Sequence, residues 1–595
     1  MSGVSRRVLA LLLFFWIFAA DYLLFYFSSD DLMNLYQAVD DGPRLWPGLA
    51  VFWSSRFSRP LGQIVYLGLY SVFGFHPFPF KLFMLLLLTA NLLIFWRVAS
   101  LLLNDSRLGA LAALLLAYHP SEPGDIWGFF GNFAYIYDML CFTLMYAAFS
   151  IWLQVRAKCR FPGAGTILVL CCLHVLALDT KEMAVALPVL LLARELVWGD
   201  LVSWKQRRIE WRALRAIAVL AILNVVFLIG KSSGADSLWN QAEYRPTFTL
   251  HVYLLNMSRY LNQAFYCGGF FRSGVTAWFL CGGLALTVLL RARAALFGWL
   301  WFIIATLPIA FIPGRTGMVL YIPLPGLAVG LADLLRTVVR KTAGETRYLN
   351  PAATPAFLLI SLCLLPVNWR LKQAADAAPR QQANQFREFA ADLRQFGPAR
   401  RGASLLYLRD PFLPGRFDPE FLASLLRRQH DLRAARAKRN LALLAPAVVA
   451  TYDDVYDFDR GHLRWIAPAE RPQVLDRLRA QSGFVEPRSG IVDPSSTTWW
   501  TEKNFAVAVH CPASATQCVL VMEVATPSPV EACTVAVDVA GVTWRNFRLE
   551  GWSAGYPIQI PVRSRDSGTP VAFHVSGGGA GSSLPALVVS SIRLN

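Results

Sequence analysis

The chain has 595 residues, of which 55% are hydrophobic and only 16% are charged, and its mean hydropathy is +0.42. Such hydropathy is too high for an ordinary soluble enzyme and indicates a polytopic α-helical membrane protein. The formal net charge of +17 would suggest nucleic-acid binding in a soluble protein. Here the basic residues lie in short loops between apolar segments, where they act as topology signals facing anionic lipid. The composition therefore argues for membrane lipids as surroundings and against nucleic acid as a partner.

Eleven apolar segments predict about eleven transmembrane helices. They lie at 8–27, 80–102, 107–119, 133–154, 164–179, 182–198, 213–230, 274–290, 295–312, 317–335 and 352–367. Several are shorter than the roughly 20 residues that a perpendicular crossing needs, which is tolerable where helices are broken or border a protein-lined cavity. With Arg6 and Arg7 inside, the basic loops all fall on the cytoplasmic side. This alternation predicts a cytoplasmic N-terminus and an extracytoplasmic C-terminal region.

Asp30 and Asp31 follow directly on the first apolar segment. At such a position, desolvation and mutual repulsion can raise the pKa of one carboxylate and prepare it to act as a base. The simpler alternative is that the two acids mark the watery end of a membrane helix. The pair becomes a candidate catalytic site because other ionisable residues are expected nearby.

The predicted topology brings further charges to the same membrane face. Charged groups at membrane depth are costly and by default suggest a functional site. Two alternatives without a functional role stay open: Lys181 and Glu182 could neutralise each other at a helix junction, and His119 could only line the interface. The candidate substrate-binding residues are Arg56, Arg59, His119, Glu122, Lys181 and Glu182.

Three domains are predicted: a transmembrane domain at 1–370, a mixed α/β segment at 371–482 and a β-sandwich at 483–595. The mixed segment contains expected helices at 380–397 and 419–440, a short buried strand at 404–408 and a hairpin at 448–465. Beyond it, short alternating runs separated by Gly, Ser and Pro are typical of a β-sandwich. The expected strands are 505–510, 518–524, 534–539, 556–561, 571–575 and 587–594.

The cysteines and tryptophans of the tail lead to two smaller expectations. Cys511 and Cys518 could bridge a hairpin if the tail is extracytoplasmic, which would leave Cys533 unpaired, and no cysteine has metal-ligand spacing. The tryptophans either fill the sandwich core or bind sugar through exposed rings. They are Trp499, Trp500, Trp544 and Trp552.

The order of the motifs resembles that of the GT-C membrane glycosyltransferases, especially the bacterial relatives of the protein O-mannosyltransferases and the lipid A aminoarabinose transferase. The resemblance covers about residues 1–335, and the tail lies outside it. Where the family commonly has Asp-Glu in the first outer loop, this chain has Asp30-Asp31. The motifs in order are Asp30-Asp31, Arg59-Pro60-Leu61, Phe73-Gly74, His119-Pro120 and Lys181-Glu182 with Ala186-Leu187-Pro188.

The resemblance implies inverting transfer of a sugar from a polyprenyl-phosphate donor to a glycan, lipid or protein acceptor. It places the reaction on the extracytoplasmic (periplasmic) face of a bacterial inner membrane. Asp30 would be the general base, and Lys181, matching the lysine after the family's fifth span, would stabilise the phosphate leaving group with Arg56 or Arg59. The role of Asp31 stays open; two acids beside a phosphate could hold a divalent cation, but the reaction does not require one. The alternative class is a transporter or flippase of lipid-linked sugars, which often shows inverted repeats that this sequence lacks.

Overall fold

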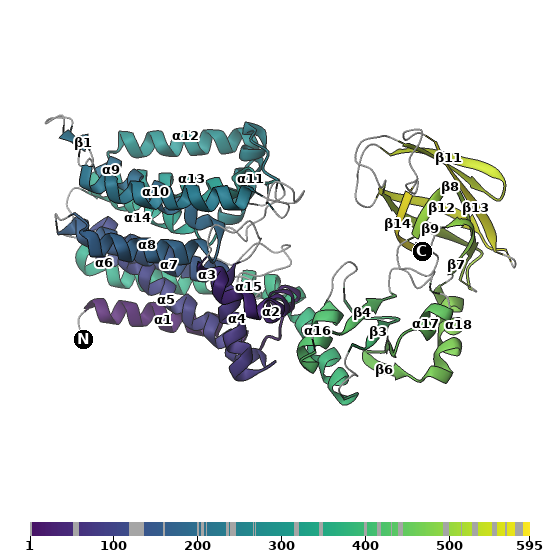
Figure 1. Cartoon of the computed structure of the whole chain (residues 1–595). Helices are drawn as coiled ribbons and strands as arrows, with labels where there is room; N and C mark the ends of the chain where they lie inside the picture. Colours follow the sequence, from purple (N-terminus) through teal and green to yellow (C-terminus); the bar gives the residue numbers. More distant parts are fainter. Residues whose placement is uncertain are drawn as a thin grey trace. The chain divides into compact units, whose positions relative to one another are not determined.

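The structure is a computed structural model of the chain, and it divides into two compact units, Met1–Phe386 and Arg387–Asn595 (Figure 1). The residues that it describes are 3–50, 59–117, 136–158, 161–198, 202–203, 208–209, 211–233, 237, 245–265, 267, 269–313, 320–343, 349–397, 402–412, 418–429, 431–437, 444, 446–482, 484–491, 499–512, 514–525, 533–549, 556–565, 568–576 and 587–594.

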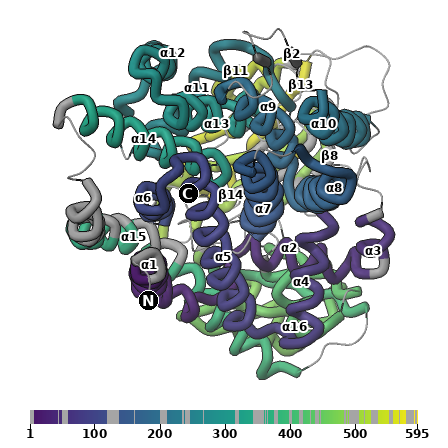
Figure 2. The backbone as a smooth tube through the Cα atoms, turned by 90° about the vertical axis from the view of Figure 1, so that its left-hand side faces the viewer, coloured from purple at the N-terminus to yellow at the C-terminus, as the bar shows by residue number. Residues whose placement is uncertain are grey.

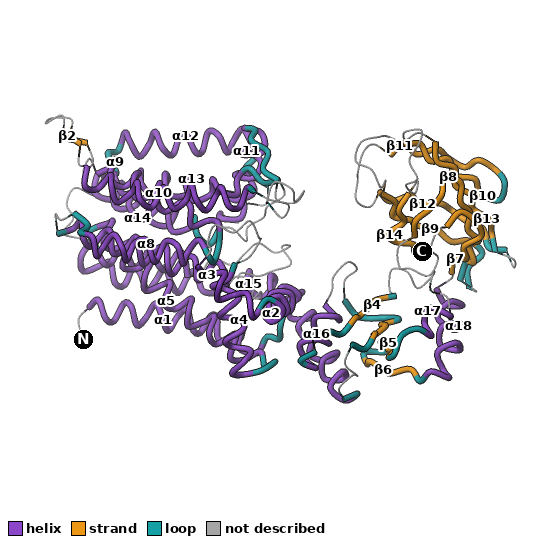
Figure 3. The backbone as a smooth tube through the Cα atoms, viewed as in Figure 1, coloured by secondary structure: helices purple, strands orange, loops and turns teal. Residues whose placement is uncertain are grey.

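The first unit is built almost entirely from helices (Figure 3). Among its described residues, the exception is a short antiparallel pair of two-residue strands, β1 (Val202–Ser203) and β2 (Arg208–Ile209). The helices in chain order are α1 (Gly3–Ala19), η1 (Ala20–Leu24), α2 (Ser29–Asp40), α3 (Gly42–Ala50), α4 (Pro60–Phe73), α5 (Pro77–Leu103), α6 (Ser106–Ala117), α7 (Ile136–Ala157), α8 (Ala164–Leu178), η3 (Glu182–Val185), α9 (Ala186–Trp198), α10 (Trp211–Ser232), α11 (Leu250–Phe265), α12 (Ser273–Leu289), α13 (Arg293–Ala310), α14 (Leu324–Ala343) and α15 (Leu349–Gln395).

Among the described residues, five helices are long and apolar enough to cross a membrane, so the protein is a membrane protein but the predicted count of eleven is wrong. The five are Arg6–Leu24, Pro77–Leu103, Ile136–Ala157, Trp211–Ser232 and Arg293–Ala310. The shorter apolar helices α6, α8 and α12 correspond to three more predicted segments.

The remaining three predicted segments are not among these helices. Segment 182–198 divides into a 3₁₀ turn and the 13-residue α9. Segment 317–335 overlaps α14, which carries Asp333, Arg336, Arg340 and Lys341. Charged side chains along this helix lower its hydropathy below what a lipid-spanning segment needs. Segment 352–367 forms the beginning of α15, a helix of 47 residues, and most of its side chains lie outside what the structure describes.

Small residues and buried amides hold the bundle together. α13 and α14 approach closely at Gly298 and Gly326, where an added Cβ would lie within 2.6 Å of the opposite backbone. Such small-residue contacts are how membrane helices pack without a hydrophobic driving force between them. At the bundle centre, the Asn91 amide donates to the Met139 carbonyl and the Tyr321 hydroxyl, each at 3.0 Å. These bonds tie α5 to α7 and to the segment before α14.

The short helices α2, α3 and α4 gather at one end of the helical bundle and pack against one another (Figures 1 and 2). Two of them follow from local sequence signals: Ser28 caps α2, and Pro60 occupies the first turn of α4, where its fixed φ favours helix initiation. Asp30 and Asp31 therefore lie in the first turn of α2, and Arg59 immediately precedes α4.

The second unit begins within α15 and contains a four-stranded sheet of order β4-β3-β5-β6. β3 pairs in parallel with both β4 and β5, and β6 is antiparallel. The predicted buried strand is confirmed as β3, and the predicted hairpin is present as β5–β6 but begins only at Asp454, because residues 448–450 belong to α17. The elements are β3 (Ser404–Tyr407), α16 (Asp418–Arg427), β4 (Arg433–Arg436), α17 (Pro446–Ala450), β5 (Asp454–Asp459), β6 (His462–Ile466), η7 (Pro468–Glu470) and α18 (Arg471–Ser482).

The predicted helix at 419–440 is correct only in its first half. α16 ends at Arg427, because Arg428 takes a left-handed backbone conformation with φ of 53°. Arg433–Arg436 then forms the edge strand β4 against β3. A tertiary pairing partner overrides the helix propensity of this Arg- and Ala-rich stretch.

The C-terminal region is a strand-rich domain of eight strands in the order β11-β10-β13-β8-β14-β9-β12, with β7 also on β8. The long β8 pairs with β14 near its start and with β13 near its end, so the sheet folds over a single core. All six predicted strands are present, and β7 and β11 are additional. The strands are β7 (Phe484–Ile491), β8 (Trp499–His510), β9 (Gln517–Ala525), β10 (Cys533–Val539), β11 (Val542–Leu549), β12 (Tyr556–Arg563), β13 (Thr569–Ser576) and β14 (Leu587–Leu594).

The predicted disulfide is confirmed, because Cys511 and Cys518 are bonded across the turn between β8 and β9. Of the four tryptophans, Trp544 is partly buried and packs against the domain core. This contact favours the core role over the sugar-binding role for that side chain. Trp552 and the side chains of Trp499 and Trp500 lie outside what the structure describes.

Candidate active site

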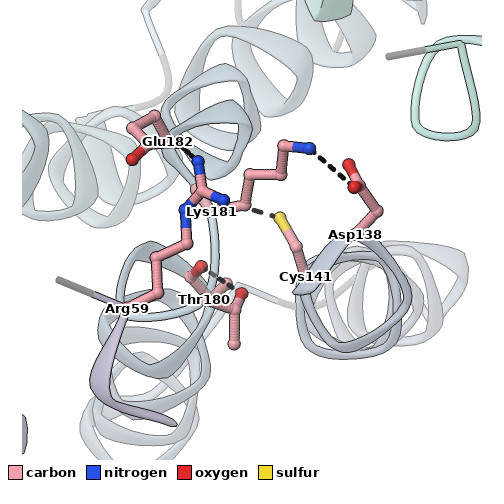
Figure 4. A network of polar contacts seen from close by, with 7 residues as sticks. Arg59, Asp138, Cys141, Thr180, Lys181 and Glu182 are labelled. Atoms are coloured by element: carbon pink, nitrogen blue, oxygen red, sulfur yellow. Dashed lines mark hydrogen bonds and ion pairs between the residues drawn. The ribbon is translucent and has the colours of Figure 1, made fainter. Parts of the chain in front are cut away.

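The connection between α8 and α9 carries the predicted pair Lys181 and Glu182. Lys181 is extended, with φ of −158° and ψ of 143°, and η3 begins immediately after it. Lys181 Nζ lies 2.6 Å from Asp138 Oδ2 on α7, whereas Glu182 Oε2 lies 3.1 Å from the Arg59 guanidinium. The two neighbouring side chains therefore reach partners on different elements (Figure 4) and do not neutralise each other.

Arg59 is held in place by the close contact of α4 with α7. Arg59 is the residue before the Pro60 that starts α4. One turn further on, an added Cβ at Gly62 would lie 2.1 Å from the Tyr137 ring, so only glycine allows this approach. The Arg59 guanidinium then lies over the same ring, 5.4 Å from its centroid. The cation–π contact and the Glu182 pair together fix the guanidinium.

Three of these charged groups retain access to solvent. The Arg59 and Glu182 side chains are 22% and 23% exposed and that of Lys181 is 15% exposed, while Asp138 is only 3% exposed. One oxygen of Asp138, Oδ1, is buried without a hydrogen-bond partner. Lys181 is thus oriented by an acid that lies deeper in the protein, whereas Arg59 and Glu182 are equally open to solvent.

The local charges keep the ion pair ionised over a wide pH range. Burial by itself would raise the pKa of Glu182, but the Arg59 guanidinium, with Lys231 and Lys181, lowers this pKa to about 2. Although burial opposes it, the same pair raises the pKa of Arg59. Both groups are therefore charged at any physiological pH.

Asp179 caps the end of α8 beside this cluster. It is 3% exposed and its Oδ2 is buried without a partner. Burial raises the pKa of Asp179 to about 7, although the Lys231 charge acts in the opposite direction. The carboxyl of Asp179 is consequently divided between its neutral and charged forms near neutral pH.

Asp31 is the more buried of the two acids in α2. The Ser28 amide donates to Asp31 Oδ2 at 2.8 Å, and the Asp31 amide donates to Ser28 Oγ at 3.2 Å, which forms a capping box. Lys81 Nζ lies 3.0 Å from the same carboxylate, and both side chains are completely buried. Burial raises the pKa of Asp31, and Lys81 and the Ser28 bonds counteract this effect. Asp31 is therefore the third helical residue of the α2 capping box, with Ser28 as the cap, and the counterion of Lys81 on α5.

Asp30 differs from its neighbour because it is partly exposed on the first turn of α2. Its backbone carbonyl accepts a hydrogen bond from the Asn34 amide at 2.7 Å, which stabilises the first turn. Of the two acids, Asp30 is the one that a substrate could reach.

Two tyrosines connect the acids of α2 with the cations of the junction. The Tyr66 and Tyr137 rings lie 5.9 Å apart between their centroids. Burial, together with the charges of Asp31 and Asp30, raises the pKa of the Tyr66 phenol. Asp30 thus acts on one ring of this pair, Tyr66, and Arg59 lies over the other, Tyr137.

Five of the eight predicted site residues are described, namely Asp30, Asp31, Arg59, Lys181 and Glu182. The other three, Arg56, His119 and Glu122, lie outside the described residues.

Sequence reasoning missed three charged residues of this region, Lys81, Asp138 and Lys231. Asp138 and Lys231 stand in terminal turns, and Lys81 stands in the second turn, of predominantly apolar helices. An ionisable residue in such a segment is by default a functional or paired residue, so this signal was present in the sequence. The sequence could not show that Lys181 pairs with Asp138 or that Asp31 pairs with Lys81.

No group of three or more His, Cys, Asp or Glu side chains suited to a metal ion occurs among the residues that the structure describes. Asp31 is committed to Ser28 and Lys81, so the two adjacent acids do not act as equivalent metal ligands.

Comparison with known proteins returns neither a matching family model nor a matching curated protein. Functional assignment of this chain therefore depends on the arrangement of its own residues.

Proposed function

We propose that this protein is a GT-C-type membrane glycosyltransferase that moves a sugar from a polyprenyl-phosphate carrier to an acceptor hydroxyl. The observation that carries the proposal is a set of partly exposed charged groups: the cations Lys181 and Arg59 at one junction, and the acid Asp30, which is linked to Arg59 through the Tyr66–Tyr137 ring pair. The resemblance in motif order adds to it. We further propose that the membrane is a bacterial inner membrane with the site on its periplasmic face and the N-terminus in the cytoplasm.

The two kinds of charged group suit the two halves of such a reaction. Asp30 accepts the proton of the acceptor hydroxyl, and the resulting oxygen attacks the anomeric carbon of the sugar. The bond between that carbon and the phosphate oxygen breaks, and its electron pair leaves with the polyprenyl phosphate. Attack from the face opposite the leaving group inverts the anomeric centre.

The leaving phosphate gains negative charge as this bond breaks. Preorganised cations in a site of low dielectric constant stabilise such a charge more strongly than water does. Lys181 and Arg59 are suited to this role because their acidic partners already fix their positions. Asp31 contributes indirectly, since its capping box orients the first turn that carries Asp30.

The proposal is tested with protein reconstituted in liposomes. Radiolabelled polyprenyl-phosphate sugars, offered as a panel together with membrane extract, should yield a labelled product that no longer extracts with the donor lipid. The Asp30→Asn variant should give little of it. If label instead crosses the bilayer while still attached to its carrier, the protein is a flippase of lipid-linked sugars and the proposal is wrong.

A further inference from the structure

Residues 25–28, the segment that leads from η1 into α2, lie buried without belonging to a helix or strand. One side of this segment packs on aromatic rings: the Phe27 ring lies 4.6 Å from that of Phe75 and 5.3 Å from that of Phe80. The segment fixes where α2 begins and hence where Asp30 and Asp31 lie. Because it has no regular hydrogen-bonding ladder, its position depends on side-chain contacts.

The long helix α15 provides the contacts on another side. Lys372 Nζ lies 2.5 Å from Asp21 Oδ2, and its side chain is 2% exposed. Its ammonium lies 4.5 Å from the centroid of the Tyr22 ring, 5.2 Å from that of Trp369 and 5.7 Å from that of Phe18. A cation enclosed by three rings and paired with a carboxylate is a strongly fixed contact.

Two further residues of α15 continue this line of contacts toward the acids. Arg380 pairs with Asp21 and lies over the Phe25 ring, 5.0 Å from its centroid. Gln382 donates through its amide to Ser29 Oγ at 3.2 Å. Lys372, Arg380 and Gln382 thus contact the chain between Asp21 and Ser29, the residue immediately before Asp30.

We infer that Lys372, Arg380 and Gln382 are positioning residues that clamp the start of α2 and so hold Asp30 at the reaction centre. They touch no reacting atom in this scheme and act through Asp21, Phe25 and Ser29. The expected effect on catalysis rests on the proposed function, whereas the clamping of the start of α2 rests only on the contacts of α15 described above. Misplacing a catalytic group by about 1 Å can slow a reaction by about a hundredfold.

The test combines a labelling readout with a kinetic one. Leu32→Cys introduces a buried thiol near the start of α2, and the rate of its modification by a maleimide reports opening of the segment. The protein without this cysteine measures labelling of the native thiols. Lys372→Met removes the clamping charge, and Arg370→Met on the same helix, an exposed position, is the matched control.

We expect Lys372→Met to increase the labelling rate about tenfold or more and to lower kcat by about a hundredfold with little change in the donor KM. Arg370→Met should change neither. If Lys372→Met does not accumulate, Gln382→Ala provides a milder test because it removes one hydrogen bond and no buried charge.

The two readouts separate the clamp from the proposed activity. Unchanged labelling in both Lys372→Met and Gln382→Ala would overturn the inference, whatever the kinetics. Faster labelling in a protein whose unmodified form transfers no sugar would support the clamp and contradict the proposed function. Faster labelling with normal turnover would show that the clamp does not position a catalytic group and would overturn the positioning role.

Discussion

Two sets of ion pairs among the candidate site residues differ in how far water can reach them. The Asp31–Lys81 pair between α2 and α5 is completely buried on both sides. The Lys181–Asp138 and Arg59–Glu182 pairs at the α8–α9 junction are partly open, and the cations Lys181 and Arg59 are 15% and 22% exposed.

In the proposed function, this difference separates a structural pair from a reactive one. A closed pair cannot exchange its partner for a substrate without leaving a charge buried and uncompensated. A partly open cation can turn toward an incoming phosphate while its acid stays in place. Adjacent or similar residues in the sequence thus take different roles according to burial alone.

The largest effect on stability should come from breaking the closed pair. Lys81→Met leaves Asp31 as an unpaired buried charge, so we expect a loss of about 3–5 kcal/mol of stability, measured as a lower thermal midpoint in detergent. Arg97→Met, an exposed position on the same helix, is the control. The double variant Asp31→Asn/Lys81→Met should recover part of the loss; failure to recover any would mean that the pair is not the cause.

Opening the reactive pair should affect catalysis more than folding. Lys181→Ala removes a contact to the departing phosphate, so turnover should fall by about two to three orders of magnitude, and donor affinity should fall as well. Donor binding and single-turnover rates measure the two effects, with the exposed Lys158→Ala as control. Normal donor affinity together with normal turnover would remove Lys181 from the site.

The buried carboxyl of Asp179, beside the α8–α9 junction, should make the stability of the protein depend on pH. Its pKa of about 7 in the folded protein exceeds the ordinary value of 3.8, so the folded state binds the proton more tightly and loses relative stability as the pH rises between these values. Asp179→Asn should therefore stabilise the protein by roughly 2–4 kcal/mol at pH 8, and the gain should shrink as the pH falls toward 4. Thermal midpoints across this range provide the measurement; a gain that does not vary with pH would contradict the assignment.

The smallest effect should come from the second unit. Replacing Cys511 and Cys518 together by serine opens a bond that closes a loop with a sequence separation of only 7. Such a short loop limits the entropic contribution, so we expect a loss of about 2 kcal/mol and no change in donor binding by the membrane unit. An unchanged unfolding transition of the C-terminal domain would show that the bond does not form in the purified protein.

Prediction from sequence succeeded where one physical signal dominates. Long apolar runs located α5, α7, α10 and α13, and alternation located six of the C-terminal strands. It missed β7, which contains Pro487, and β11, an edge strand whose residues are mostly exposed. Neither strand has the alternating apolar pattern that marks a half-buried strand.

The site was predicted in part for a related reason. The position of charges beside apolar segments identified Lys181, Glu182 and the two acids of α2. The pairing partners could not be predicted, because Asp138 and Lys81 lie 43 and 50 residues from the residues that they bind. One feature of the sequence could have distinguished the two acids. Ser28 lies three residues before Asp31, which is the spacing of a capping box. This spacing predicts a structural role for Asp31, so that Asp30 is the candidate for the general base.

The central claim is that Asp30 is the general base, and one substitution tests it directly. Asp30→Asn keeps the size of the side chain and removes its ability to accept a proton, so the rate of sugar transfer should fall by roughly two to four orders of magnitude. Donor binding and the thermal midpoint should stay near those of the unmodified protein. Asp40→Asn, at an exposed position in the last turn of the same helix, should transfer sugar normally. Transfer by folded Asp30→Asn at the unmodified rate would contradict this placement of the active site.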